Sequence, residues 1–156
     1  MGRKERIHRY VANIKISNVP LGNAFNQVYH VLGKFEAYGT DLEIENCTSN
    51  TRGLLQVALD QVMYFVENFS LHGCQLMLDD LVSIIYGIYM KNNCYDLSNN
   101  IILDRDPVHL MELKESIRAI RNAEVQFKEF SLLGCSFSML EKKDLMHEAG
   151  SLNLLM

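Results

Sequence analysis

Pairs of histidine and glutamate are the first residues in this sequence that could hold a metal. Glu5 and His8 are separated by two residues, which on a helix would place both side chains on one face, as in a di-metal carboxylate site. Such a site needs a second Glu-x-x-His pair and two further glutamates on facing helices. His109 and Glu112 have the same separation, but in the reverse order. The sequence therefore predicts no metal centre and no cofactor.

A nuclease or nucleophilic centre is the second chemistry to consider. Arg3 and His8 have the R-x4-H spacing that small helical ribonucleases of the HEPN class place on one helix face. His72 and Cys74 flank Gly73, but the other cysteines stand alone and a zinc site needs about four ligands. No segment places a base beside a serine or cysteine nucleophile, and no glycine-rich phosphate-binding motif is present. We predict no catalytic residues and a protein that is not an enzyme, with a HEPN-like ribonuclease as an alternative.

The charge pattern makes nucleic acid an unfavourable main partner. The chain holds 15 Lys and Arg against 19 Asp and Glu, a formal net charge of −4, so its overall field repels phosphate. The first fifteen residues are nevertheless basic, with Arg3, Lys4, Arg6, Arg9 and Lys15 against the single acid Glu5. Because a basic arm can touch phosphate, a small nucleic-acid-binding regulator stays open as the alternative function.

Composition places the chain among single-domain intracellular proteins. Apolar residues make up 48% and charged residues 22% of 156 residues, which is enough to form one core. The longest apolar run, 84–90, is far shorter than the roughly 20 residues that a membrane helix needs. The four cysteines form no C-x-x-C pair and, without an export signal, are expected to be reduced and mostly buried. We expect a cytoplasmic protein with no membrane partner.

Helical periodicity is the strongest pattern along the chain. Apolar residues at three- and four-residue spacing predict helices from Leu21 to about Gly39 and over about 52–71, 75–91 and 107–133. Asp106 before Pro107 is expected to cap the fourth helix. Ser138 and Glu141 have capping-box spacing before a short fifth helix that ends near residue 148.

The segments between these helices are less regular. Residues 41–51 are polar and predict a loop, although Leu42, Ile44 and Cys47 could instead form a very short strand. A further short helix is expected over about 3–14, and 150–156 is expected to be a frayed or docked tail. The predicted fold is all-α: one domain, 1–156, built as an antiparallel bundle of four to five helices with short connections.

One hexapeptide occurs almost twice. Residues 69–74, FSLHGC, match residues 130–135, FSLLGC, at five of six positions. The flanking residues differ, whereas a duplication should extend beyond one element. We therefore interpret the two segments as similar helix ends, each capped by its glycine, Gly73 or Gly134.

Tyrosines and methionines on apolar helix faces are the candidate binding residues. A helical domain with partly exposed Tyr, Met and Leu along a groove can receive a peptide or helix, although buried tyrosines more often only fill a core. The residues selected for partner binding are Tyr10, Tyr29, Ile85, Tyr86, Tyr89 and Met90.

The order of these features resembles the FliS-type flagellin export chaperones, which are small cytoplasmic antiparallel helical bundles. Tyr10, Pro20 and the run Val28-Tyr29-His30-Val31 occupy places comparable to that family's N-terminal tyrosine, proline and Leu-Tyr-Asp-Gly run. Ser70-Leu71-His72 and the run 85–90, IYGIYM, are similar to its Ser-Leu-Asp and Leu-Tyr-x-Tyr-Met segments. Leu103-Asp104-Arg105-Asp106 is similar to the step before its last core helix. The likeness covers about residues 10–123, and residues 135–156 have no counterpart in the family.

The resemblance implies a non-enzymatic chaperone or adaptor of a secretion or flagellum system that holds a flagellin-like segment. It also implies that residues 1–19 act as a movable cover, with Tyr10 over a groove whose floor includes Tyr86 and Tyr89. The predicted partner is a peptide segment or helix of another protein. Whether the chain forms a homodimer stays open.

Overall fold

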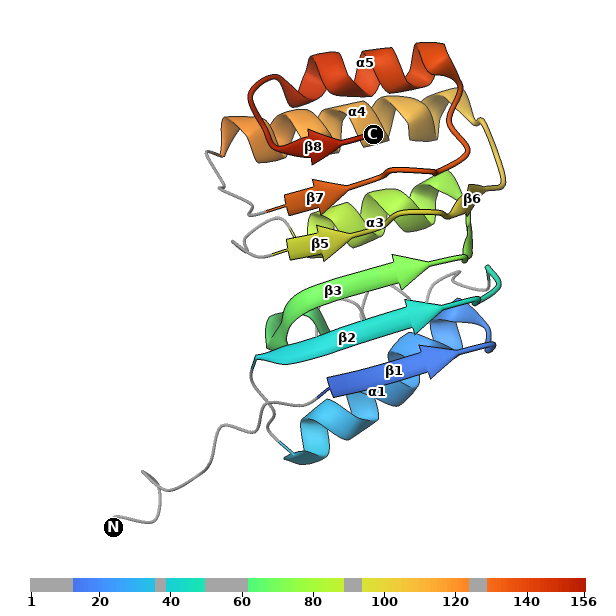
Figure 1. The fold of residues 1–156 in the computed structure, drawn as a ribbon, viewed down its shortest axis with the longest axis vertical. Coiled ribbons are helices and arrows are strands. Elements are labelled where there is room, and N and C mark those ends of the chain that lie inside the picture. Colours follow the sequence, from blue (N-terminus) through green and yellow to red (C-terminus); the bar gives the residue numbers. More distant parts are fainter. Residues whose placement is uncertain (1–12, 36–38, 50–61, 89–93, 124–128) are drawn as a thin grey trace.

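The computed structural model describes residues 13–35, 39–49, 62–88, 94–123 and 129–156 (Figure 1). Its central feature is a six-stranded sheet with the order β1-β2-β3-β5-β7-β8, in which every neighbouring pair is parallel. The strands are β1 (Asn13–Ser17), β2 (Thr40–Glu45), β3 (Val66–His72), β5 (Cys94–Asp96), β7 (Glu129–Ser131) and β8 (Leu154–Leu155). Because the strand order follows the chain order, the chain advances steadily in one direction, as in a solenoid.

Helices connect the strands and lie behind them in the view of Figure 1. They are α1 (Leu21–Phe35), α3 (Leu78–Ile88), α4 (Pro107–Asn122) and α5 (Met139–Ala149), and residues 62–65 are also helical. Parallel neighbours need such crossovers because the chain must return to the same end of the sheet before each new strand. The helices and the inner side of the sheet share one core, in which Phe25 of α1 stacks on Phe69 of β3 with ring centroids 6.1 Å apart.

Each main strand up to β7 is followed by the same sharp turn. Each turn contains one residue with a positive φ, one to three residues after the end of the strand: Asn18, Asn46, Gly73, Asn99 and Gly134, with φ between 56° and 72°. Asparagine and glycine are the residues that adopt this left-handed conformation at least cost. After two of these turns the chain pairs once more, as β4 (Gln75–Leu76) beside β6 (Ile101–Ile102).

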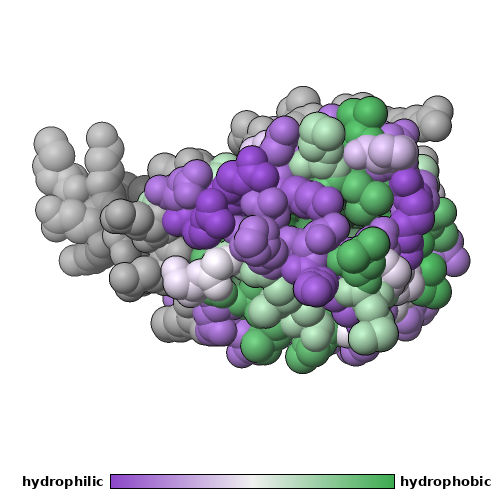
Figure 2. All heavy atoms as spheres, turned by 90° about the horizontal axis from the view of Figure 1, so that it is seen from above, coloured by the Kyte–Doolittle hydropathy of each residue, from purple (hydrophilic) through white to green (hydrophobic). Residues whose placement is uncertain are grey.

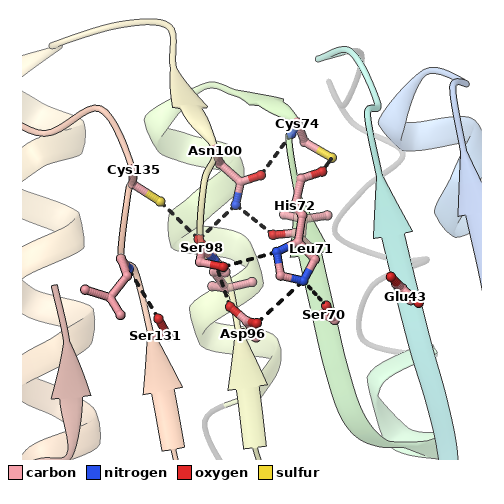
Figure 3. Close-up of polar contacts among 12 residues, drawn as sticks. Glu43, Ser70, Leu71, His72, Cys74, Asp96, Ser98, Asn100, Ser131 and Cys135 are labelled. Carbon is pink, nitrogen blue, oxygen red and sulfur yellow. Dashed lines mark hydrogen bonds and ion pairs between the residues drawn. The ribbon is translucent and has the colours of Figure 1, made fainter.

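A buried side chain follows each of the last four turns, and three of them, Cys74, Asn100 and Cys135, bond the neighbouring turn. Asn100, 1% exposed, accepts the Cys74 backbone N–H at 3.0 Å and donates to the carbonyls of Leu71 and Leu97, both at 2.9 Å (Figure 3). The Cys135 thiol donates to the Leu97 carbonyl at 3.0 Å, and the Cys74 sulfur accepts the Cys47 N–H at 3.4 Å. These bonds satisfy turn groups that would otherwise be buried without partners.

The prediction of an all-α antiparallel bundle is wrong, because the sheet above is the centre of the fold. Residues 66–71, predicted as the end of a helix, belong to β3, and 129–131, at the end of another predicted helix, form β7. Residues 41–45, expected as a loop, belong to β2, as the short-strand alternative suggested. Val62, Val66 and Phe69 have helical spacing, yet only Val62 lies in a helix; the pairing with β2 and β5 outweighs that local pattern.

The helix signals that depend on local chemistry are confirmed. Asp106 caps α4 by accepting the Val108 N–H at 2.9 Å, with Pro107 as the first helical residue. Ser138 and Glu141 form the reciprocal capping box at the start of α5. The helices expected from Leu21 and within 75–91 are also present, as α1 and α3.

The interpretation of the repeated hexapeptide is also corrected. Phe69 pairs with Tyr95, and Tyr95 pairs with Phe130, so both copies occupy the same place in the two solenoid turns that flank the turn of Tyr95. Gly73 and Gly134 end strands, not helices. The two copies match because each supplies a strand, the sharp turn and the buried cysteine.

Candidate functional site

The structure describes three of the six predicted partner-binding residues. Tyr29 on α1 is 41% exposed and Tyr86 on α3 is 49% exposed, so each could contact a partner from its own helix. Ile85 is completely buried and belongs to the core. Tyr10, Tyr89 and Met90 lie outside the described residues, as do Arg3, Glu5 and His8 of the proposed nuclease and metal pairs.

His72 and Cys74, which flank Gly73 in the sequence, lie in different surroundings. His72 is half-buried on the outer side of the sheet, whereas Cys74 is buried and its thiol donates to the His72 carbonyl at 3.4 Å. Burial raises the pKa of the Cys74 thiol to about 11, which keeps it protonated and unreactive at neutral pH. Among the described residues, no three His, Cys, Asp or Glu side chains converge as metal ligands. Cys47, Cys74, Cys94 and Cys135 are free thiols, and all but Cys94 are buried, as expected.

The outward side chains of the sheet form the surface with the most polar chemistry, which we call the open face. Along each strand they alternate with the core residues, as the burial of β2 and β3 shows. Strand pairing aligns them in rows, and the middle row contains Lys15, Glu43, Ser70, Asp96 and Ser131. The adjoining rows contain Asn13, Asp41, Asn68, Cys94 and Glu129 on one side, and Ser17, Glu45 and His72 on the other.

A cavity of about 520 Å³ opens on this face. Its lining comes from four neighbouring strands, β1, β2, β3 and β5: Asn13, Ile14, Lys15, Asp41, Leu42, Glu43, Asn68, Phe69, Ser70, Cys94 and Asp96. Pockets that bind small molecules and side chains have volumes of roughly 300–1,000 Å³. The open face therefore has room for part of a ligand or partner.

Two sets of contacts fix the charged side chains of β1 and β2. Lys15 Nζ lies 2.6 Å from Glu45 Oε1 and 4.0 Å from Glu43 Oε1. The hydrogen bond to Glu45 and the charges of both glutamates raise the pKa of Lys15. Asn68 Nδ2 donates to Asp41 Oδ1 at 2.7 Å. The carboxylates of Asp41 and Glu45 on β2 are thus held in place before any partner arrives.

A second cluster surrounds His72 and joins β3 to β5 (Figure 3). His72 Nε2 contacts Ser70 Oγ and lies 3.5 Å from Asp96 Oδ2, while Nδ1 lies 3.1 Å from Ser98 Oγ. In an Asp-His-Ser relay the carboxylate holds the imidazole by a hydrogen bond on the nitrogen opposite the nucleophile. Ser70 shares its nitrogen with Asp96. Ser98 Oγ lies on the opposite nitrogen, Nδ1, but the 3.5 Å from Asp96 Oδ2 to the ring is longer than the hydrogen bond that such a relay uses. These contacts position His72 and Asp96.

Exposed apolar residues at the α5 end form an alternative candidate for a partner-binding surface. Met139 and Leu140, in the first turn of α5, are 87% and 70% exposed. Figure 2 views the molecule from this end and shows hydrophobic side chains interspersed with hydrophilic ones.

The repeated unit follows a recognisable sequence pattern. Its order, as in Phe69-x-Leu71-x-x-Cys74-x-Leu76, resembles the leucine-rich repeat pattern: a short strand, a turn and a buried Cys or Asn. Equivalent strand positions Ile14, Leu42, Phe69, Tyr95, Phe130 and Leu154 recur at intervals of 28, 27, 26, 35 and 24 residues. Leucine-rich repeats are typically 20–29 residues long.

No family model, curated protein or solved structure matches the chain. No described helix has the length and apolar character to span a bilayer.

The open-face residues were missed because the strands were not predicted. The alternation of polar and apolar residues over 41–45 was a weak signal for β2, and the repeated hexapeptide was the strongest signal for the solenoid. Aligning that hexapeptide with the segments around Asn46 and Asn99 would have placed Glu43, Ser70 and Asp96 in one row.

Proposed function

We propose that this chain is a non-enzymatic binding protein that receives part of a partner protein on the open face of its sheet. The observation that carries the proposal is the 520 Å³ cavity formed by outward side chains of four adjacent strands. Stacked repeats produce extended surfaces of this kind, because every repeat contributes the same few outward positions. The rigid strands keep these positions fixed, which lowers the entropy cost of binding.

The general expectation of a binding protein is retained, but the helical-groove mechanism of flagellin chaperones is not. That mechanism requires an antiparallel helical bundle, and this chain forms a parallel sheet with helices behind it. The described part of the expected 1–19 cover begins at Asn13 and forms β1, which pairs with β2 over five positions. The nucleic-acid alternative depended on Arg3, His8 and the basic N-terminal arm, of which only Lys15 lies within the described residues.

The test is partner capture with a blocked open face. Ser70 is central on this face, so Ser70→Arg should fill the cavity and eliminate capture of a partner that the wild-type chain retains. Ser151→Arg is the matched control, because it introduces the same side chain at an exposed position in the turn between α5 and β8. Capture should be followed by cross-linking and mass spectrometry at moderate salt. Equal capture by both variants would refute binding at the open face.

A further inference from the structure

We infer that the partner presents a basic, extended segment to the open face. This inference rests on the proposed function and names the chemistry of the partner. On the described outward strand positions, carboxylates at Asp41, Glu43, Glu45, Asp96 and Glu129 stand against the single lysine Lys15. A face with this charge attracts cations and repels phosphate groups, so a cationic segment is the complementary occupant.

Two carboxylates next to the cavity are already oriented for such a segment. The Asn68 side-chain amide donates to Asp41 Oδ1 at 2.7 Å. The Ser98 backbone N–H donates to Asp96 Oδ1 at 3.1 Å, and Asp96 Oδ2 faces His72. Both carboxylates line the cavity, and each keeps acceptor capacity because a carboxylate has about four lone-pair sites. A guanidinium group can therefore bind without first ordering the side chains that receive it.

The spacing of these two groups fits an extended chain. Asp41 on β2 and Asp96 on β5 are two strands and one row apart. Strands lie about 4.8 Å apart, and alternate residues along a strand about 6.7 Å apart, so the two positions are about 12 Å from each other. In an extended peptide, side chains four residues apart are separated by about 13 Å and point to the same side. Arginines at positions i and i+4 of a partner segment can thus reach both carboxylates.

Lys15 limits this attraction at one end of the face. Its ammonium group already pairs with Glu45 and lies within 4.0 Å of Glu43, so it competes with an incoming cation for those glutamates. Removing this charge should strengthen the binding of a basic segment. A purely structural role of Lys15 would not give that gain.

The test measures binding of a fluorescent peptide of alternating arginine and serine to the full chain by anisotropy at two salt concentrations. A peptide of alternating glutamate and serine, and one with all arginines at one end, are the probe controls. We expect the alternating basic peptide to bind most tightly and to weaken as salt rises. Asp41→Asn with Asp96→Asn should weaken it about tenfold, since each exposed ion pair contributes about threefold. Lys15→Gln should tighten it about threefold.

The matched protein control is Glu112→Gln with Glu115→Gln, which removes two charges from α4 instead of the open face. Equal weakening by both double variants would mean attraction to net charge alone and would overturn the inference. Equal affinity for the basic and acidic peptides would do the same. If Ser70→Arg abolishes capture of a partner while the basic peptide does not bind, the open face is a binding site for another chemistry. If neither effect is seen, the proposed function fails as well.

Discussion

Replacing Asn100 with alanine should destabilise the fold by about 4 kcal/mol, because one buried side chain holds two successive turns of the solenoid. The substitution removes three hydrogen bonds, to the Cys74 N–H and to the Leu71 and Leu97 carbonyls. Each bond contributes about 0.5–1.5 kcal/mol net, and a buried donor left without a partner costs about 1–3 kcal/mol more. The Leu97 carbonyl still accepts the bond from the Cys135 thiol, so the expected loss of stability lies below the sum of the largest values.

The measurement is urea unfolding followed by circular dichroism and tyrosine fluorescence. Domains of this size unfold with a total free energy of about 5–15 kcal/mol, so the loss should be large and should lower the Tm by about 8–16 °C. Asn100→Cys is the informative control, because Cys47, Cys74 and Cys135 occupy the equivalent position in other repeats. Its sulfur can accept the Cys74 N–H as Cys74 accepts that of Cys47 at 3.4 Å, so it should cost only about half as much as alanine.

Two results would refute this reasoning. A loss below about 1 kcal/mol for Asn100→Ala would mean that water or relaxation satisfies the turn groups. Equal losses for the alanine and cysteine variants would mean that the position requires volume and not hydrogen bonding.

Three further changes test other parts of the structure. Gly134→Ala should destabilise the fold by about 1–2 kcal/mol in thermal unfolding, because φ is +72° and a Cβ would lie 2.1 Å from Asn99 Oδ1; an unchanged Tm would contradict the turn geometry. Burial raises the pKa of Asp80 above its ordinary 3.8, so the folded state binds this proton more tightly than the unfolded state. The free energy of unfolding should therefore fall as pH rises from 3.8 through the raised pKa. Asp80→Asn should not show this loss in urea unfolding at several pH values. The Arg118 guanidinium lowers the pKa of Glu148, so the pair's contribution to the free energy of unfolding should be present above pH 4.5 and lost on acidification. Arg118→Gln should remove this acid-sensitive contribution. An unchanged dependence of stability on acid pH in that variant would contradict the assignment.

The helices illustrate what local sequence can establish. Ser138 and Glu141 satisfy the first amides of α5 with their own side chains, and Asp106 does so for α4. The partners in these contacts are two or three residues apart, so sequence spacing alone indicates them. The buried stripe of α1 was predictable for the same reason, since Leu21, Phe25, Val28 and Leu32 face one side of the helix.

The candidate site illustrates what local sequence could not establish. The row Glu43, Ser70, Asp96 comes from strands about 26 residues apart along the chain, and its members become neighbours only through parallel pairing. Strands as short as β5, three residues, are too brief to show the alternation that identifies a strand. Tyr86 and Ile85, chosen together from one apolar run, separate into an exposed and a buried side chain once α3 packs.

The sequence by itself thus determined where α1, α4 and α5 begin, which face of α1 is apolar, that the thiols are mostly buried, and that the chain carries net negative charge. Only the tertiary structure decided that the segments between helices form one parallel sheet, that FSLHGC and FSLLGC are equivalent turns of a solenoid, and that polar residues of successive strands line one face. The physical reason is the range of the interactions. Helix hydrogen bonds and caps join residues within about four positions, whereas the hydrogen bonds of a parallel sheet join residues a whole repeat apart.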